Sequence, residues 1–370
     1  MPRIIVSVTN DLVTDQRVRK VCATLESEGF EILLIGRKLP QSLPIQRSYK
    51  TYRMRLLFKK SFLFYAEYNV RLLLKLLFVR KDILLANDLD TLLPNYLISR
   101  LLGKKLVYDS HELFTEVPEL IHRPSVQNVW LRIEKYIFPK LKNVITVNQV
   151  IASIYSEKYK VLVQVIRNIS NKISKVHPDQ ELVHRIKGNR KMLILQGSGI
   201  NKERGAEEAV EMMQYLDDIL LVIIGGGDVF DDLKSMIDTL KIQDKVLIVG
   251  KLPYDELLEY TKIADLGLSL DKGTNLNYEY SLPNKVFDYI QCQIPLFVSN
   301  RRVVAQLVKD NDIGVVFEKH EPKEMATSIK AIFADKECLN QWQVNLKKAA
   351  ELYNWENESK KLKEIYQNLK

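Results

Sequence analysis

The chain has 370 residues, which is more than one compact core usually holds, so we expect two domains. Its 46% hydrophobic and 27% charged residues are typical of a globular protein, and no run of about 20 apolar residues indicates a membrane-spanning helix. The net charge of +9 is unevenly distributed: residues 1–165 contain 26 Lys/Arg and 15 Asp/Glu, and the rest is close to neutral. This excess favours an anionic partner for the first part of the chain.

Strand and helix patterns alternate in the first part of the chain. The sequence predicts a buried strand over Arg3–Thr9, an amphipathic helix over Asp15–Gly29 and a second strand over Glu31–Gly36. Further short apolar strands are predicted over residues 83–86, 105–109, 144–147 and 163–166. Such strands alternating with helices indicate a parallel sheet that is covered on both faces.

The segment from Arg47 to Lys81 is basic and aromatic, with ten Lys/Arg, eight aromatic residues and one acid, Glu67. In its helical part, Glu67, Arg71 and Lys75 lie four residues apart on one narrow polar stripe, and most of the remainder is apolar. Such a helix is either buried in its domain or in contact with lipid. We expect this segment to bind an anionic membrane surface, with a core helix as the alternative. No nucleic-acid recognition motif is present, so we predict no nucleic-acid partner.

Polar residues follow two of these strands. Asp109, His111 and Glu112 come after one, and the sequence Asn87-Asp88-Leu89-Asp90 comes after another and is expected to cap the next helix. Functional residues gather at strand ends in this architecture, although a helix cap beside a satisfied histidine is the alternative. Residue 115 is Thr, so HExxH is absent and we predict no metal site.

The second part of the chain repeats the alternation after a polar segment at residues 169–190, which we interpret as a linker with a short helix. Strands are predicted over residues 192–196, 219–224, 246–249, 266–270, 296–298 and 314–317. The predicted fold class is α/β, with doubly wound domains at residues 1–168 and 191–350 and a final helical segment at 351–370. Ligands bind beyond the carboxyl ends of such strands, so two facing domains would form a cleft there.

Two glycine loops in the second domain have the character of phosphate-binding turns. Gln196-Gly197-Ser198-Gly199 precedes a predicted helix over Glu203–Tyr215, and Arg204 adds a charge suited to phosphate. The second loop is Gly225-Gly226-Gly227-Asp228. Neither loop spells GxGxxG, and the strand before the second lacks a terminal acid, so NAD is disfavoured. A plain strand-to-helix turn with a surface arginine is the alternative.

A third segment runs from Ser281 to Ile290. Pro283 stands where a helix is predicted to begin, and Lys285 falls in its first turn, where a cation is unfavourable unless an anion shares the site. Asp288, one turn further on, is positioned to accept hydrogen bonds from hydroxyl groups. A solvated helix start is the alternative.

These segments together resemble a family 4 (group 1) retaining glycosyltransferase of the GT-B fold. The resemblance covers nearly the whole chain, and its most specific piece is Pro283-Asn284-Lys285. The other pieces are Thr9 to Val18, Tyr108 to Glu112, Gly197 to Gly205, Ile224 to Gly227, Val286 to Tyr289 with Ile294-Pro295, and Tyr353 to Glu356. The resemblance implies two Rossmann-like domains that face a cleft, with a last helix that returns to the first domain.

The resemblance also implies roles for single residues. Asp288 matches the second acid of the E-x7-E motif, which binds the donor ribose, and Arg204 matches the basic residue that grips the diphosphate. His111 matches a histidine that reaches the donor sugar. Gly227 and the turn ending at Leu252 match backbone contacts to the nucleotide.

The expected donor site also includes Ser198, Gly199 and Asn284. Two positions depart from the family pattern: the first acid of E-x7-E falls at Tyr280, and an earlier arginine falls at Ser198. We expect Lys285 to replace the missing phosphate charge.

The predicted activity is transfer of a hexose from a nucleoside diphosphate sugar to a lipid-linked or saccharide acceptor, with retention, in polysaccharide or glycolipid biosynthesis. The resemblance implies no metal and no cofactor beyond the sugar nucleotide. The cysteines, Cys22, Cys292 and Cys338, have no pairing spacing, so we expect a reduced, intracellular chain. Together with the basic segment from Arg47 to Lys81, this predicts a cytoplasmic, peripheral membrane protein. The alternatives are a nucleotide-sugar epimerase and a non-catalytic, membrane-associated scaffold of the same fold.

Overall fold

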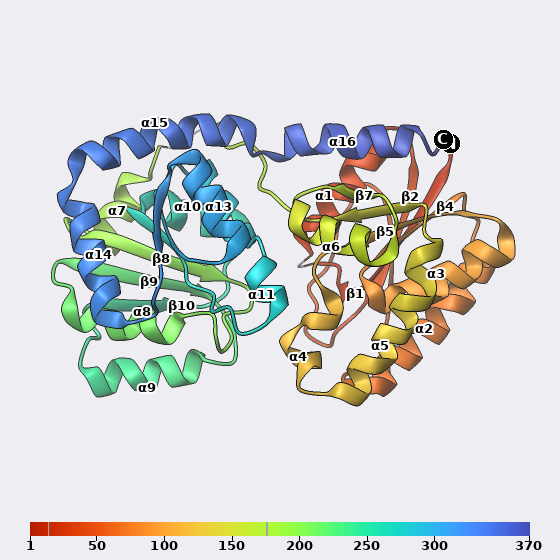
Figure 1. Cartoon of the computed structure of the whole chain (residues 1–370), viewed down its shortest axis with the longest axis horizontal. Helices are drawn as coiled ribbons and strands as arrows, with labels where there is room; N and C mark the ends of the chain where they lie inside the picture. The colour runs from red at the N-terminus through yellow and green to blue at the C-terminus, as the bar shows by residue number, and fades with distance from the viewer. Residues whose placement is uncertain (14, 175–176) are drawn as a thin grey trace. The chain divides into compact units, whose positions relative to one another are not determined.

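The computed structural model describes residues 1–13, 15–174 and 177–370, and the chain divides into two compact units (Figure 1). The first unit comprises Met1–Asn168 and Glu358–Lys370, and the second comprises Ile169–Asn357. The segment interpreted as a linker belongs to the second unit, because Ile169 and Leu182 lie in its hydrophobic core.

The first unit is built on a parallel sheet of seven strands in the order β3-β2-β1-β4-β5-β6-β7. The sequence order reverses between β1 and β4, so a crevice is expected at the carboxyl ends of these two strands. The strands are β1 (Arg3–Asp11), β2 (Glu31–Arg37), β3 (Lys50–Met54), β4 (Ile83–Asn87), β5 (Lys105–Ser110), β6 (Asn143–Thr146) and β7 (Val163–Val165).

All of these strands except β3 are predicted from the sequence. The strand β3 lies at the edge of the sheet and carries Lys50 and Arg53, so its composition conceals the strand pattern. Every residue of β4 is buried, as expected for a strand in the middle of a sheet with both faces covered.

Helices cover both faces of this sheet. The carboxylate of Asp15 caps α1 by accepting a hydrogen bond from the backbone N–H of Val18 (3.0 Å), and Gly29 takes a left-handed conformation (φ 83°) just after its end. The helices are α1 (Gln16–Ser27), α2 (Ser61–Phe78), α3 (Leu89–Leu102), α4 (Pro118–Ile121), α5 (Pro124–Ile137) and α6 (Gln149–Tyr159), with short 3-10 turns at Phe114–Glu116 and Phe138–Lys140.

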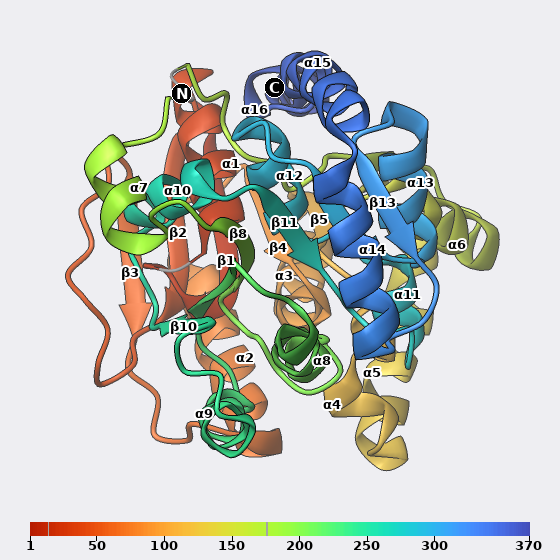
Figure 2. The same cartoon turned by 90° about the vertical axis from the view of Figure 1, so that its left-hand side faces the viewer.

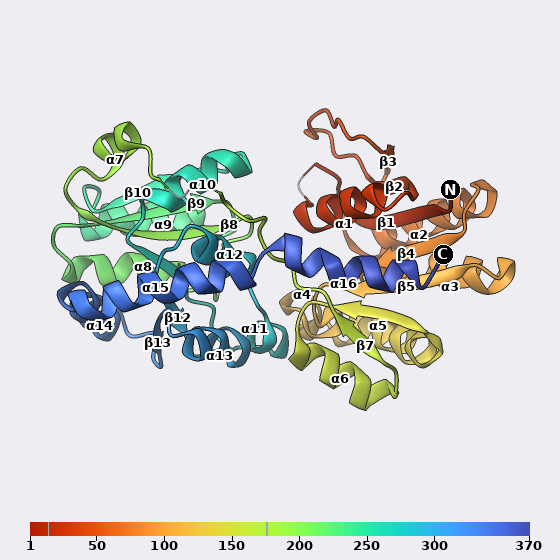
Figure 3. The same cartoon turned by 90° about the horizontal axis from the view of Figure 1, so that it is seen from above.

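The helix α2 has one face buried in its unit and an apolar face that is exposed. Its buried residues, which recur every four positions, are Phe64, Tyr68, Leu72 and Leu76. The opposite face exposes Leu63, Val70, Leu74 and Leu77 to solvent. The helix lies beside α3, and α5 follows on the other side of α3 (Figures 1 and 3).

The second unit is built on a parallel sheet of six strands in the order β10-β9-β8-β11-β12-β13. All six strands are predicted from the sequence, because each is short, apolar and bounded by turns. They are β8 (Lys191–Gly197), β9 (Ile219–Gly225), β10 (Val246–Val249), β11 (Leu266–Ser269), β12 (Leu296–Ser299) and β13 (Gly314–Phe317).

Two hydrophobic cores lie on the two faces of this sheet. One is formed with α8 (Ala206–Met212), α9 (Phe230–Leu240) and α14 (Pro322–Ala334), of which α8 and α14 lie side by side (Figure 2). The other is formed with α7 (Gln180–Ile186), α10 (Tyr254–Ile263), α12 (Asn284–Gln291), α13 (Arg302–Asn311) and α15 (Lys336–Leu352). The short helix α11 (Leu276–Tyr280) precedes α12.

The last helix, α16 (Trp355–Gln367), contributes its final turns to the first unit. There the ring of Tyr366 is fully buried and packs edge-on against Phe30 (6.0 Å between ring centroids). Ion pairs flank this contact, from Lys363 to Glu28 (2.9 Å) and from Arg167 to Glu358 (3.3 Å). The first unit therefore includes two separate stretches of the chain.

Candidate functional site

Arg204 is held by a tight turn in front of α8. The predicted helix start at Glu203 is wrong: Glu203 (φ 69°) and Gly205 (φ 74°) are both left-handed, and the helix begins at Ala206. A side chain at position 205 would place its Cβ 2.4 Å from the carbonyl oxygen of Leu270, so only glycine fits there.

The Arg204 side chain lies against Asp271, a residue that follows β11 at its carboxyl end. Its Nη1 atom is 3.2 Å from Asp271 Oδ2, and its guanidinium stacks over the ring of Tyr278 at 4.2 Å from the centroid. Burial alone would lower the pKa of Arg204, but the charge of Asp271 outweighs it and the pKa is raised.

Lys285 is the second cation of this cluster and lies in the first turn of α12, as predicted. Burial lowers its pKa; Arg204 lowers it further, and Asp271 acts in the opposite direction. Within the described part of the chain, Lys285 has no ion pair or hydrogen bond. Arg204 pairs with Asp271, whereas Lys285 remains without an ion pair among the described residues, so an anion such as phosphate would balance the excess positive charge.

Asp271 is the functional residue that the sequence analysis missed. Its side chain is only 3% exposed, although it stands at the end of a strand where ligand sites occur in this architecture. An acid directly after a buried strand was the available signal, but neither glycine loop nor the Pro-Asn-Lys segment contains it.

The two glycine loops pack on each other. The N–H of Ile200 donates a hydrogen bond to the carbonyl oxygen of Gly226 (2.7 Å). A Cβ at position 227 would lie 1.8 Å from the carbonyl oxygen of Ile200, so close packing of the loops itself requires this glycine. Ser198 and Gly199 are exposed at the tip of the first loop, where a ligand could reach their backbone.

Asp288 is nearly buried and already has three side-chain partners. Its Oδ1 atom accepts hydrogen bonds from Ser170 and from Tyr254 (2.7 Å), and its Oδ2 atom accepts one from Gln196 (2.9 Å). A ribose hydroxyl would therefore have to exchange with one of these donors. Asn284 is exposed at the start of the helix, and Leu252 is half-buried after β10.

The acid beside Tyr280, the position at which the E-x7-E motif lacks its first acid, also has partners. Glu279 pairs with Arg301 (2.8 Å) and accepts a hydrogen bond from the N–H of Arg302 (3.2 Å). Its carboxylate therefore fixes the start of α13, while Tyr280 lies beside Arg302.

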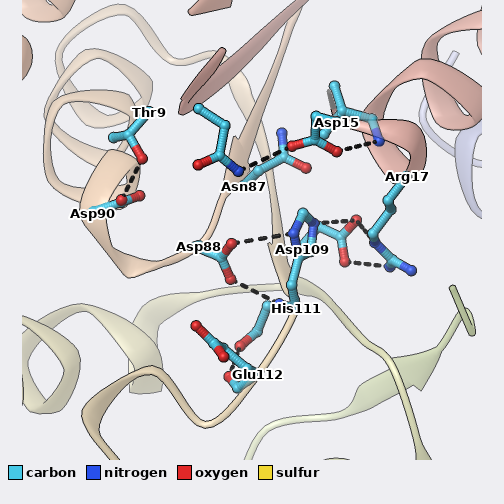
Figure 4. Close-up of polar contacts among 12 residues, drawn as sticks. Thr9, Asp15, Arg17, Asn87, Asp88, Asp90, Asp109, His111 and Glu112 are labelled. Carbon is cyan, nitrogen blue, oxygen red and sulfur yellow. Dashed lines mark hydrogen bonds and ion pairs between the residues drawn. The ribbon is translucent and has the colours of Figure 1, made fainter. Parts of the chain in front are cut away.

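In the first unit, His111 lies between two carboxylates (Figure 4). Its Nδ1 atom is 3.1 Å from Asp88 Oδ2, and its Nε2 atom is 3.5 Å from Asp109 Oδ2. Asp109 also forms a buried, bidentate ion pair with Arg17, whose guanidinium donates hydrogen bonds to both carboxylate oxygens (2.6 and 3.1 Å). Asp88 stands at the N-cap position of α3, within the segment predicted to cap this helix, but its side chain makes no cap hydrogen bond; its carboxylate instead accepts a hydrogen bond from the N–H of His111 (2.8 Å).

The charges around His111 fix its protonation. Burial would lower the pKa of His111, but Asp88 and Asp109 outweigh it and raise the pKa to about 10. Burial would likewise raise the pKa of Asp109, but Arg17 and His111 lower it to about 2. At neutral pH, His111 is therefore an imidazolium and does not act as a base.

A cavity of about 390 Å³ lies next to His111, lined by residues from the ends of β1 and β4. Asp90, one of its lining residues, accepts a hydrogen bond from Thr9 (2.6 Å) through Oδ2. Burial, reinforced by the charge of Asp88, raises the pKa of Asp90 to about 8. The carboxyl group is therefore largely protonated at neutral pH.

The predicted polar stripe of α2 is partly confirmed. Glu67 pairs with Arg71 (2.7 Å) and also accepts hydrogen bonds from the backbone of Leu57 and Phe58, whereas Lys75 lies over the ring of Tyr52. In the residues that the structure places, no helix has the length and apolar character needed to cross a membrane.

All three cysteines are free, and two of them, Cys22 and Cys292, are buried. Across residues 1–13, 15–174 and 177–370, no three His, Cys, Asp or Glu side chains gather into a group that would hold a metal ion.

Two protein-family models together match most of the chain. Residues 159–349 match the model for glycosyl transferases group 1, and residues 15–171 match that for glycosyltransferase family 4. Curated relatives include the chitobiosyldiphosphodolichol beta-mannosyltransferases of Candida albicans (27% identical over 122 residues) and Pongo abelii (27% over 141). These matches cover 32% and 37% of this chain but only 26% and 29% of the relatives.

Solved structures resemble the chain over its whole length. Sucrose-phosphate synthase from Thermosynechococcus elongatus has a TM-score of 0.80 at 15% identity and covers 100% of this chain and 99% of its own. Anabaena HepE, in complex with UDP and glucose, has a TM-score of 0.76 at 14% identity and covers 99% and 100%. With the two parallel sheets, this likeness confirms the predicted α/β class and GT-B fold.

Proposed function

The chain belongs to the glycosyl transferases group 1 family, and from this premise we propose that it transfers a hexose from a nucleoside diphosphate sugar to a lipid-linked or saccharide acceptor. The reaction class, glycosyl transfer, follows from the family. The identity of the transferred sugar as a hexose, retention of configuration and independence from metal are the finer parts of the proposal, and they rest on the resemblance of the motifs.

The observation that carries the proposal is the charge imbalance around Asp271. Arg204 stands before α8 and pairs with Asp271, and Lys285 stands in the first turn of α12, has no ion pair among the described residues and has a pKa that responds to the charges of both. In the proposed reaction, a sugar diphosphate supplies the missing negative charge, and the leaving nucleoside diphosphate is stabilised by fixed cations. Positioning by the glycine loops, with Ser198, Gly199 and Gly227, would supply the remaining orientation.

His111 would assist as a cationic donor. Its Nε2 atom is 3.5 Å from Asp109, a separation too long for a strong hydrogen bond, so this N–H is available to a sugar hydroxyl. Asp288 would contact the ribose after exchange of Tyr254 or Ser170, and Asn284 and Leu252 would line the nucleotide.

We also assign the membrane as a partner of the first unit, which gives a cytoplasmic, peripheral location and a role in polysaccharide or glycolipid assembly. The helix α2 exposes large apolar residues at both ends, with Phe62 71% and Phe78 82% accessible, and lies within the basic segment Arg47 to Lys81. Apolar residues flanked by Lys and Arg suit an anionic leaflet.

The test is nucleotide binding followed by product analysis. UDP, GDP and ADP are each titrated into the protein, into the variants Arg204→Ala and Lys285→Ala, and into the control Lys323→Ala, which changes an exposed lysine of α14. We expect one nucleotide to raise the melting temperature by several degrees at 100 times its Kd, equivalent to about 2.7 kcal/mol. Both site variants should lose this shift, and the control should keep it.

Two outcomes would overturn the proposal. If no nucleotide binds, the non-catalytic scaffold becomes the better account. If the sugar nucleotide is converted to its epimer without transfer to an acceptor, the activity is that of an epimerase. When transfer is observed, the anomeric configuration of the product, determined by NMR, tests retention.

A further inference from the structure

The cavity beside His111 lies wholly in the first unit, beyond the carboxyl ends of β1, β4 and β5. Its lining combines aromatic rings, buried hydrogen-bond acceptors and cations. We propose that this cavity binds a glycosyl phosphate, with the sugar ring against the aromatic residues and the phosphate at Lys59 and Lys60. The inference rests on the proposed function, in which this compound is the acceptor.

The aromatic part of the lining is formed by four residues from three segments of the chain: Phe64, Tyr65, Phe114 and Trp130. Trp130 packs edge-on against Tyr65 (5.2 Å between centroids) and against Phe114 (5.3 Å). Mutual packing of this kind fixes the rings in place. A sugar ring has an apolar face of C–H groups, and a rigid aromatic wall with a few polar groups nearby matches that surface.

Two buried oxygen atoms of the lining residues lack a hydrogen-bond partner among the described residues. They are Asp90 Oδ1 and Asn87 Oδ1. The opposite atoms of both side chains are engaged, with Thr9 donating to Asp90 Oδ2 and Asn87 Nδ2 donating to the carbonyl oxygen of Ser7 (3.1 Å) (Figure 4). A buried polar atom without a partner costs about 1–3 kcal/mol, so the hydroxyl groups of a ligand, which both donate and accept hydrogen bonds, would be favourable here.

Besides His111, which is paired with Asp88 and Asp109, the cations of the lining are Arg37, Lys59 and Lys60. Both lysines are exposed, and within the described part of the chain neither forms an ion pair. They directly precede α2, an 18-residue helix whose first turn has no side-chain cap, so its N–H groups are also available to an anion. The Arg37 guanidinium lies 5.0 Å from the centroid of Phe64, and its Nε atom has no hydrogen-bond partner in the described residues.

The acidic residues of the lining limit the ligand to one anionic end. Asp15, Asp88, Glu112 and Glu119 also line the cavity, so a ligand with charge distributed along its length would be repelled. A neutral sugar that carries its phosphate at one position avoids this repulsion.

Apolar side chains flank the two lysines on both sides in the sequence. Leu57 and Phe62 are 78% and 71% exposed, and Phe58 is also exposed. A phosphate bound at Lys59 and Lys60 would therefore be close in sequence to an exposed apolar segment. This arrangement suits a phosphate that continues into a lipid, and the experiment below separates this source from a soluble sugar phosphate.

The experiment measures binding to the full chain by tryptophan fluorescence and thermal shift. The probes are glucose 1-phosphate, galactose 1-phosphate and N-acetylglucosamine 1-phosphate, with the free sugars and inorganic phosphate as references. We expect one sugar phosphate to bind at least 10-fold more tightly than its free sugar. The double variant Lys59→Ala/Lys60→Ala should lose that advantage, whereas the matched control Lys142→Ala/Lys160→Ala, which changes exposed lysines outside the cavity, should retain it.

A second variant tests the sugar end of the cavity. Asp90→Asn keeps the shape of the side chain and should weaken the sugar phosphate several-fold without changing the affinity for inorganic phosphate. Nucleotide affinity, measured in parallel, should be unchanged in all four proteins. If a nucleotide binds and no soluble or lipid-linked sugar phosphate does, the inference is overturned and the proposed function stands. If a sugar phosphate binds and no nucleotide does, the proposed function is overturned and the assignment of the cavity stands.

The source of the phosphate is distinguished by a prenyl-phosphate sugar in detergent. Tighter binding than the corresponding soluble sugar phosphate assigns the cavity to a lipid-linked compound, and equal or weaker binding assigns it to a soluble one. No binding of either the prenyl-phosphate sugar or the soluble probes would overturn the inference.

Discussion

In the second unit, Arg204 pairs with the buried carboxylate of Asp271 and Lys285 has no ion pair among the described residues, whereas in the first unit His111 and Arg17 are matched by two carboxylates, Asp88 and Asp109. The first arrangement leaves a positive charge that an anionic ligand would balance, and the second is internally neutral. Positive side chains alone therefore do not identify an anion site; the number of carboxylates that face them does.

The same comparison separates two uses of a cation. His111 is fixed by its neighbours and keeps its charge over the physiological range, so it supports the structure around it and offers one N–H. Lys285 has a lowered pKa and no partner in the described residues, so its charged form is destabilised in the folded state, and a bound anion would stabilise it.

The largest expected effect is on turnover in the second unit. Lys285→Ala and Arg204→Ala should each reduce kcat by about 100- to 1000-fold, because each removes a fixed charge from the leaving diphosphate. Steady-state kinetics with the donor identified by the binding screen measures this loss, and circular dichroism checks the fold. Lys323→Ala should leave turnover unchanged. Normal turnover in both site variants would show that the excess positive charge near Asp271 does not stabilise the leaving diphosphate.

A smaller effect is expected where the glycine loops meet. Gly227→Ala places a Cβ 1.8 Å from the carbonyl oxygen of Ile200, so the loops must separate, at a cost of about 1–3 kcal/mol in the free energy of unfolding. Gly250→Ala is the matched control, because nothing lies within 4 Å of the added atom. Urea unfolding measures both variants. Equal stabilities would show that the loop packing does not require glycine at position 227.

The sequence predicted the two sheets well because their strands are short, apolar and separated by helical patterns. It missed β3, whose charged residues suit an edge strand, and it placed the start of α8 too early because the left-handed backbone at Glu203 leaves no clear signal. Boundaries of this kind depend on contacts such as that of Gly205 with Leu270, which are far apart in the chain.

The sequence predicted only those residues of the candidate site that belong to a motif. Arg204 and Lys285 both lie in motif segments, but Asp271, which pairs with Arg204, is outside every motif. The partners of Asp288 come from positions 170, 196 and 254, so no local pattern indicates that its carboxylate is occupied. Long-range hydrogen bonds therefore decide whether a motif residue is available to a ligand.

The next prediction concerns pH and tests the neutral cluster of the first unit. The pKa of His111 is raised to about 10, so its ion pairs contribute stability in full below the ordinary histidine value of 6.5, and this contribution declines as pH rises toward 10. His111→Gln should remove that decline, so its unfolding free energy should fall less than that of the wild type between pH 6.5 and 9.5. His122→Gln changes an exposed histidine and should behave as the wild type. Parallel curves for all three proteins would show that His111 is not held as a cation.

The smallest expected effect is on membrane binding by the basic segment. Arg80 follows the exposed end of α2, and a basic residue near an anionic leaflet contributes about 1 kcal/mol, so Arg80→Gln should weaken partition into anionic vesicles by about fivefold. Lys160→Gln removes the same charge from α6, away from the segment, and should have less effect. Sedimentation with vesicles at low and high salt measures both, and the difference should shrink as salt screens the charges. If the two variants lose equal affinity, net charge alone drives binding; if only Arg80→Gln does, then the face around α2 is the part of the first unit that meets the membrane.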